Sequence, residues 1–262
     1  MIKTIIISTC LTCLVPMVSA QEYGNKQICI DSTSRFVRTA GPNRFDSSGH
    51  AVGKLGIDRK LFGDFNARVE YLLEPSFSET IGCRIYRRAT DTAYVLEVKR
   101  VDNYKEVEDQ VQKEFPTISI PGKEFFAMSE EEHARVLAHN RQQWGRMAAE
   151  RLKRYRIRTI SVPISDRLAD RLYEATKGEI LNIEPEKKQY TKEGGEIITL
   201  IFDGEPATFR CVVEDDTVWT LRYHVPEGAF KILSDLFRAM IADVEAGRFD
   251  EERYQATLDD ME

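Results

Sequence analysis

Cysteine is scarce in this sequence, with five in 262 residues. Two of them, Cys10 and Cys13, lie within the first twenty residues, and the other three are Cys29, Cys83 and Cys211. Small secreted domains that depend on disulfides contain far more cysteine than this. The scarcity therefore excludes a disulfide scaffold and indicates a fold held together mainly by packing.

Long hydrophobic runs are also missing. The longest apolar stretch, Ile5–Val15, has eleven residues, whereas a membrane-spanning helix needs about 20. It follows the basic Lys3 and precedes the small residues Ser19 and Ala20. This order is typical of a secretory signal peptide. We therefore expect residues 1–20 to be a signal peptide cleaved after Ala20, which leaves a soluble secreted or periplasmic protein without a transmembrane segment.

A lipid anchor is the alternative interpretation of the N-terminal segment, because Cys10 and Cys13 both lie in its apolar run. A lipid-modified cysteine usually follows a very small residue, but here each cysteine follows a threonine. Cleavage at either cysteine would also leave part of the apolar run on the mature chain. A cleaved soluble protein is the interpretation that fits these residues better.

Positive charge is not in excess, since 37 Lys and Arg stand against 43 Asp and Glu, a net charge of −6. A sequence-independent nucleic-acid binder needs a basic surface to displace counterions from phosphates. Glycosylation acceptors of the form Asn-x-Ser/Thr are absent, which favours a bacterial periplasm. We therefore expect the partner to be a protein, a glycan or an envelope component, and not a nucleic acid.

Catalytic motifs are absent as well. There is no Gly-x-Ser-x-Gly elbow and no Ser-x-x-Lys pair. His133 and His139 are six residues apart on one predicted helix, about 240° around its axis, and cannot converge on one metal ion from that helix alone. The sequence thus identifies no catalytic, cofactor-binding or metal-binding residue, and it contains no motif that identifies a family.

Two functions from different classes remain. We predict a non-catalytic binding or interaction protein, and the alternative is a cell-envelope or polysaccharide hydrolase that acts through a pair of carboxylates. Glycoside hydrolysis needs two carboxyl groups about 5–9.5 Å apart. With 43 acidic residues in the chain, sequence does not single out such a pair.

Hydrophobic patterning predicts an α+β fold with mainly antiparallel sheet, packed by amphipathic helices. A group of three segments in which apolar and polar residues alternate, followed by one segment with apolar residues at helical spacing, occurs twice. The first group comprises strands at 65–73, 80–87 and 93–100 and a helix at 103–115; the second comprises strands at 196–202, 207–213 and 217–224 and a helix at 230–244. We therefore expect two strand-strand-strand-helix units.

The two units also share local sequence, since Asp91-Thr92-x-Tyr94-x-Leu96 matches Asp216-Thr217-x-Trp219-x-Leu221. Either an internal duplication or the chance recurrence of a short strand pattern explains the match, and the sequence leaves both open. The secreted region 21–262 is accordingly one α+β region or two lobes, about 21–128 and 129–262.

A long helix is predicted between the two units, from Ser129 to about Lys153. The stretch Arg135–Arg158, which includes most of this helix, carries eight basic residues against the single acid Glu150. A solvated helix face is the ordinary explanation of such a charge excess. The alternative is an interaction surface, for which Trp144, Arg141 and Arg151 are the candidate residues.

The apolar faces of the predicted strands make two further predictions. Cys83 and Cys211 both lie on apolar faces, so they are either buried free thiols or bonded to each other as a disulfide. The helix at 230–244 should pack on the strand face that carries Phe209, Trp219, Leu221 and Tyr223, because both surfaces are too apolar to face water. Trp219 would then be a structural residue.

Overall fold

The computed structural model describes residues 28–33, 35–42, 56–63, 65–76, 78–88, 93–185, 189–190, 196–197, 204–214 and 217–259. The expected signal peptide, residues 1–20, lies outside these ranges. Within them, no helix has the length and apolar character needed to cross a membrane.

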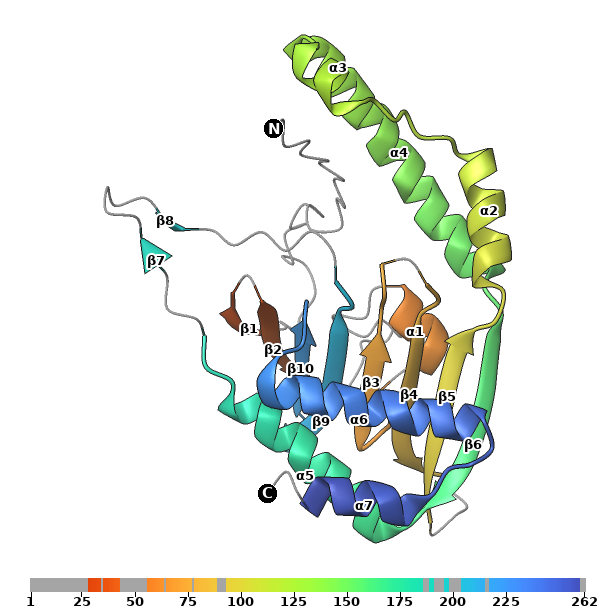
Figure 1. The fold of residues 1–262 in the computed structure, drawn as a ribbon, viewed down its shortest axis with the longest axis vertical. Coiled ribbons are helices and arrows are strands. Elements are labelled where there is room, and N and C mark those ends of the chain that lie inside the picture. The colour runs from red at the N-terminus through yellow and green to blue at the C-terminus, as the bar shows by residue number, and fades with distance from the viewer. Residues whose placement is uncertain are drawn as a thin grey trace, which may run out of the picture. The chain divides into compact units, whose positions relative to one another are not determined.

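Eight strands form one sheet in the order β1-β2-β10-β9-β3-β4-β5-β6 (Figure 1). Antiparallel neighbours dominate the sheet. The strands are β1 (Ile28–Ser32), β2 (Phe36–Pro42), β3 (Val69–Leu73), β4 (Ile81–Arg87), β5 (Tyr94–Val101), β6 (Ile157–Ile164), β9 (Ala207–Glu214) and β10 (Thr217–Tyr223). Two short strands, β7 (Gln189–Tyr190) and β8 (Glu196–Ile197), pair separately. The α+β class with mainly antiparallel sheet is confirmed.

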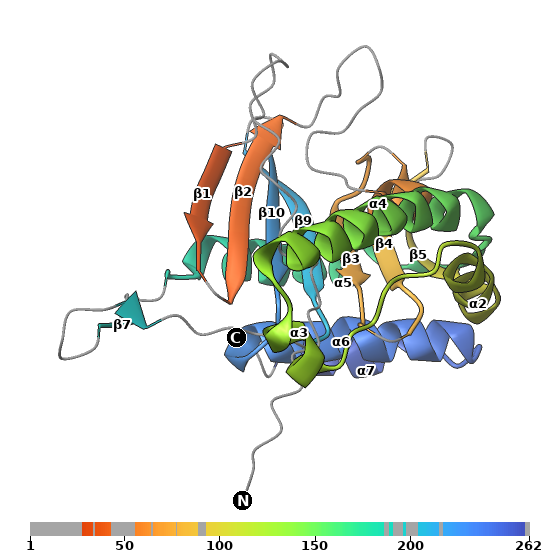
Figure 2. The same cartoon turned by 90° about the horizontal axis from the view of Figure 1, so that it is seen from above.

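Three helices cover one face of this sheet, as Figures 1 and 2 show: α5 (Asp166–Asn182), α6 (Gly228–Glu245) and α7 (Glu251–Asp259). Their buried apolar residues form the main core with those of the strands. The short helix α1 (Ile57–Phe62) packs through Leu61 and Phe62 against Leu72 of β3. Gly82 of β4 makes room for Phe62, because a Cβ at Gly82 would lie 2.7 Å from the Phe62 ring.

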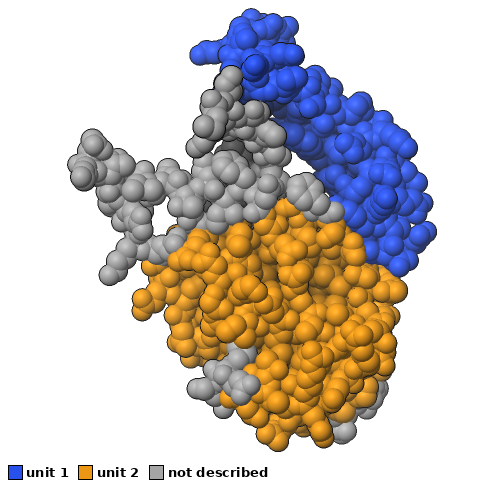
Figure 3. Space-filling view, viewed as in Figure 1, with its two compact units in different colours: residues 1–16, 101–156 blue, residues 17–100, 157–262 orange. Residues whose placement is uncertain are grey.

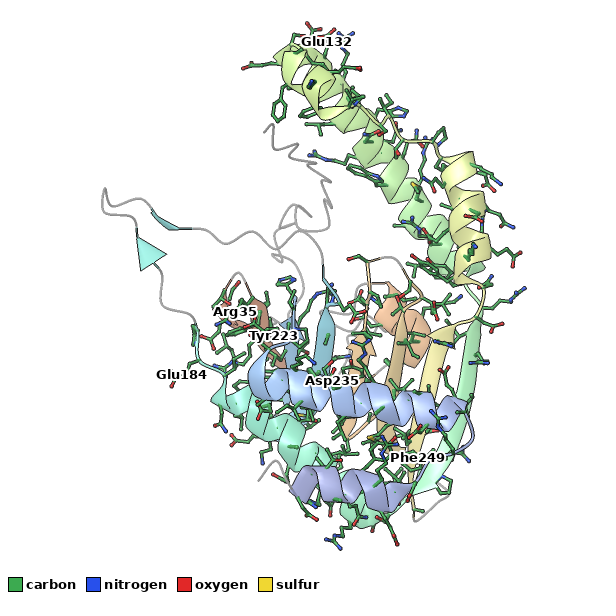
Figure 4. All side chains as sticks on the ribbon, in the orientation of Figure 1. Arg35, Glu132, Glu184, Tyr223, Asp235 and Phe249 are labelled. Carbon is green, nitrogen blue, oxygen red and sulfur yellow. The ribbon has the colours of Figure 1, made fainter. Side chains whose placement is uncertain are left out.

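Helix α6 packs on the strand face that the sequence indicated, so that prediction is confirmed. The Phe237 ring lies 6.0 Å from Phe209, and the Phe230 ring lies 5.3 Å from Tyr223, which Figure 4 labels. Trp219 is partly buried and packs against the same core. Burying large apolar side chains stabilises a fold by about 1.5–3 kcal/mol each, so α6 is a principal core element.

The predicted first unit is present, since β3, β4 and β5 are consecutive neighbours in the sheet. In the predicted second unit, β9 and β10 are neighbours, but β8 pairs with β7. The rest of that expected strand, residues 198–202, lies outside the described residues. The arrangement of two strand-strand-strand-helix units therefore stays a prediction.

The described residues divide into two compact units, which Figure 3 colours separately. One is the helical stretch 101–156, and the other contains the sheet with α1 and α5–α7. The two-lobe alternative set a boundary near residue 129, which falls within this helical stretch. The division differs because a single sheet takes strands from both halves of the chain.

The cysteines on the apolar faces are both buried free thiols, so the disulfide considered above is not formed. The reason is the strand order. Strand β3 lies between β4, which carries Cys83, and β9, which carries Cys211. Two strand spacings amount to about 10 Å, beyond the Cα separation of about 7 Å that a disulfide allows. The third described cysteine, Cys29, is exposed.

Candidate functional site

The helical stretch is an insertion between two neighbouring strands, β5 and β6. It contains α2 (Tyr104–Glu114), α3 (Gly122–Ala127) and α4 (Glu130–Arg154). The backbone N–H of Asp102 donates a 2.9 Å hydrogen bond to the carbonyl oxygen of Arg156, so the chain enters and leaves the insertion at one point. We refer to residues 102–156 as the helical insertion.

Charged side chains join α2 to the C-terminal part of α4. The Arg151 guanidinium donates two hydrogen bonds, of 2.7 and 2.6 Å, to the Glu108 carboxylate. Tyr155 donates from its hydroxyl to the same carboxylate, and this bond with burial raises the pKa of the phenol. Arg154 binds Glu114 in the same two-point manner, at 2.7 Å for each bond. Two parallel hydrogen bonds between an arginine and a carboxylate fix the orientation of the two side chains as well as the distance between them.

The extended segment before α3 is fastened to α4 by a buried asparagine. Asn140 accepts a 2.8 Å hydrogen bond from the Ile118 N–H and donates a 2.9 Å bond to the Ile118 carbonyl oxygen. The His133 ring stacks on Phe125 at 4.3 Å. These contacts, with those to α2, occupy one side of α4 along its length.

Local sequence also determines where α4 begins. Ser129 caps the helix and forms a capping box with Glu132, which Figure 4 labels at the start of α4. Ser165 caps α5. Asn103 precedes α2 but makes no side-chain cap; it binds the backbone at Arg154 and Arg156 and so closes the base of the insertion.

A second side of α4 is exposed and contacts no other element of the insertion. We call it the open side of α4; its exposed residues are Ala134, Leu137, Ala138, Arg141, Gly145 and Ala148. Trp144 and Leu152 border it and are partly exposed. A Cβ at Gly145 would meet nothing within 4 Å. The side is therefore accessible, and its small and apolar residues lie beside the exposed polar side chains of Arg135, Gln142 and Arg146.

The three predicted interaction residues have different environments. Arg141 is exposed on the open side and has no ion-pair partner among the described residues, and Trp144 is partly exposed beside it. Arg151 instead holds Glu108 and stabilises the insertion from within. The alanines and Gly145 were not predicted, although their spacing at three- and four-residue intervals was a signal that the sequence contains.

The face of the sheet opposite the main core carries a row of paired charges. At one level of the strand register, Glu97, Arg84, Glu70 and Arg210 stand side by side on β5, β4, β3 and β9. Arg84 binds Glu97 at 2.7 Å, and Arg210 binds Glu70 at 3.0 Å. Glu70 is 2% exposed and Arg210 is 8% exposed. Buried charges need such partners, so this row is explained by structure alone.

Other titratable groups offer little for catalysis. Burial raises the pKa of Cys83, and it raises that of Cys211 to about 12, which keeps both thiols protonated and poorly nucleophilic. Burial lowers the pKa of His224. In the described ranges, no three histidine, cysteine or acidic side chains come together in a way that could hold a metal ion.

Compared with protein-family models, curated proteins and solved structures, the chain has no significant match. Its function must therefore be inferred from its own residues, and the open side of α4 is an accessible surface of the described helical insertion.

Proposed function

We propose that this protein is an exported, non-catalytic binding protein that contacts its partner through the open side of α4. The observation that carries the proposal is a 25-residue helix in which only Asn140 and Met147 are buried. Helices in water depend on packing for most of their stability. A helix of this length with one side uncovered is suited to present a surface.

The contacts of α4 support this role because they hold the helix in place without covering the open side. Arg151 and Arg154 fasten its last turns to α2, and Asn140 fastens its middle to the segment before α3. A surface that is fixed before binding loses less conformational freedom when a partner docks.

The distribution of exposed apolar side chains also supports the proposal. Six large apolar side chains are exposed in the described ranges, and three of them, Ile118, Phe126 and Leu137, lie in the insertion. Phe126 is 69% exposed. Leu137 lies on the open side, so this surface includes an exposed large apolar side chain, as interaction surfaces commonly do.

Site-specific photo-crosslinking in the producing cell tests this role. A photoreactive residue at Leu137, on α4, should give a discrete adduct. The matched control is the same residue at Ile232, which is 52% exposed on α6. Adducts at neither position, or at Ile232 alone, would contradict the proposed binding surface.

Export is tested separately, by intact-mass measurement of the protein recovered from outside the cytosol. The expected mass is that of a chain beginning at Gln21. A chain that retains residues 1–20, or one that carries a lipid on Cys10 or Cys13, would contradict a cleaved and unanchored product.

One observation favours the alternative, a cell-envelope or polysaccharide hydrolase. Burial raises the pKa of the Glu74 carboxyl; Arg222, 2.6 Å away, opposes the shift, and the charge of Asp58 adds to it. A carboxyl whose pKa is raised by burial and by the charge of a second carboxylate resembles the general acid of such an enzyme. Release of soluble fragments from purified cell wall, abolished in Glu74→Gln, would support the hydrolase; no release by the wild type would exclude it for that substrate.

A further inference from the structure

The basic residues of the stretch Arg135–Arg158 fall into two groups. One group forms ion pairs with acids of the described chain and consists of Arg151, Lys153, Arg154, Arg156 and Arg158. The other group consists of Arg135, Arg141 and Arg146, which are exposed on α4. Their guanidinium groups form no hydrogen bond, ion pair or ring contact with any described residue. The charge of these three arginines is therefore not used within the described fold.

Arginines without a partner are unusual in this protein. Among the arginines that the structure describes, only Arg167, exposed on α5, shares this condition with the three on α4. Elsewhere arginines bind carboxylates, as Arg84 and Arg210 do on the sheet. The free guanidinium groups thus gather within residues 135–146 of one helix, on and beside its open side.

The middle of α4 is also free of acids. Residues 133–149 contain no aspartate or glutamate, although acids outnumber bases in the chain as a whole. The acids that bound this span are already engaged, because Glu132 accepts hydrogen bonds from Ser129 and Glu150 binds Lys153. The span is about 25 Å long. It is a local positive surface on a protein of negative net charge.

We propose that the partner of the open side of α4 is an acidic protein segment whose carboxylates pair with Arg135, Arg141 and Arg146. The inference rests on the proposed function, because it names the partner of the same surface. Arginine binds carboxylates through two parallel hydrogen bonds, as Arg151 binds Glu108 inside this insertion. A positive surface also attracts an acidic partner before contact and selects it over basic ones.

Helical geometry places the three arginines on both borders of the open side. Arg135 and Arg146 are eleven residues apart, about 16 Å along the axis, and differ by only about 20° around it. Arg141 lies between them in height and about 120° from Arg135 around the helix. A partner segment that lies along the open side can therefore place carboxylates against arginines on both of its flanks.

The neighbouring side chains favour a protein over other polyanions. Leu137, four residues before Arg141, is 39% exposed and gains from an apolar contact. A protein segment offers apolar side chains together with carboxylates, whereas a carboxylated polysaccharide offers no aliphatic side chain. An anionic membrane would be repelled by Glu130, Glu131 and Glu132 in the first turn of α4.

The first test measures binding of fluorescently labelled poly-L-glutamate to the protein produced without residues 1–20. We expect binding that weakens as salt is added, because the charges are exposed. Arg141→Glu combined with Arg146→Glu should weaken it at least about tenfold. Arg167→Glu makes the same change at a free arginine outside α4 and should alter the affinity by less than about twofold. Circular dichroism of the variants establishes that they are folded.

Two competing polyanions are measured with the same protein: polygalacturonate, a carboxylated polysaccharide, and vesicles of phosphatidylglycerol. Tighter binding to either of them than to poly-L-glutamate would overturn a protein segment as the occupant. No binding of poly-L-glutamate at low salt, or binding that the double variant leaves unchanged, would overturn the role of the three arginines.

Photo-crosslinking at Leu137 in the producing cell separates this inference from the proposed function. An adduct that the double variant loses and Arg167→Glu retains supports both, provided that mass spectrometry identifies a protein cross-linked through an acidic segment. An adduct that persists in the double variant would leave the binding role standing and overturn the inference about charge. Absence of any adduct would contradict the proposed function as well.

Discussion

Both faces of the sheet contain buried side chains, but these are apolar on one face and charged on the other. On the helix-covered face, residues such as Phe209 and Leu221 are fully buried among other apolar groups. On the opposite face, Glu70 and Arg210 are also buried, but as an ion pair. An ion pair of this kind adds little net stability, yet removal of one partner leaves a buried charge that is strongly destabilising. The row of charges therefore constrains which strands can lie beside one another.

Thiol reactivity should separate Cys29, Cys83 and Cys211 in a protein produced without residues 1–20. In the folded protein, a maleimide should modify only Cys29, because burial both shields Cys83 and Cys211 and raises their pKa values. Mass spectrometry should show one adduct on the native protein and three after denaturation. Native labelling of Cys83 would show that the face bearing it is open to water.

Truncation of Phe237 should be among the most damaging single changes. Phe237 is fully buried, and its ring lies 5.0 Å from Tyr71. Phe237→Ala should lower the free energy of unfolding by about 3–5 kcal/mol. Ile232→Ala, on the exposed side of the same helix, should change it by less than about 0.5 kcal/mol. Urea denaturation of both variants measures the difference, and equal effects would contradict the packing of α6.

Sequence alternation correctly indicated which residues of a strand share a face, as for Cys83 on β4 and Cys211 on β9. It did not indicate which strands are neighbours, because alternation has the same period in every strand. The pairing of Glu70 with Arg210 across 140 residues was therefore not predictable, nor was the separation of the two cysteines by β3.

Some interactions of helix α4 join residues that are close in sequence, and others join residues that are far apart. Its start at Ser129 was predictable because a capping box involves residues only three positions apart. The role of Arg151 was not, since its partner Glu108 lies 43 residues earlier in the chain. An arginine predicted for an interaction surface thus proved to be part of the internal support of α4. The basic excess in this stretch arises partly from such internal ion pairs.

Glycine-to-alanine substitutions should separate glycines in open surroundings from a closely packed one. Gly145→Ala should stabilise the protein by about 0.5–1 kcal/mol, because the added methyl meets nothing and the unfolded chain loses freedom. Gly178→Ala in α5 has the same open surroundings and should behave alike. Gly82→Ala should destabilise, since its Cβ would lie 2.6 Å from the Tyr71 carbonyl oxygen. Thermal unfolding measures all three, and destabilisation by Gly145→Ala would contradict an uncovered α4.

In the described chain, eight strands from both halves of the sequence form one sheet. Sequence periodicity identified β3, β4, β5, β9 and β10, and these are the strands at the centre of the sheet. It did not reveal that β9 pairs with β3, since that contact joins segments more than 130 residues apart. Long-range pairing depends on the complementarity of whole faces, which local patterns do not encode.

Removal of the helical insertion should leave the sheet unit folded. The backbones of Asp102 and Arg156 are hydrogen-bonded at 2.9 Å, so a two-residue Asn-Gly turn in place of residues 103–155 can join β5 to β6. The shortened protein should unfold cooperatively, as a folded domain does. A molten product that binds hydrophobic dyes and lacks a thermal transition would contradict an independent sheet unit.

The strand order also has a consequence for how the chain folds as it is made. The hairpin of β1 and β2 joins the rest of the sheet only through β10, and β10 reaches β3 only through β9. Both joining strands belong to the last quarter of the chain, which leaves the ribosome late. Until residues 207–223 have emerged, the N-terminal hairpin has no neighbour in the sheet, and the contacts between distant segments that slow folding cannot form. The topology thereby delays completion of the sheet until most of the polypeptide has been synthesised.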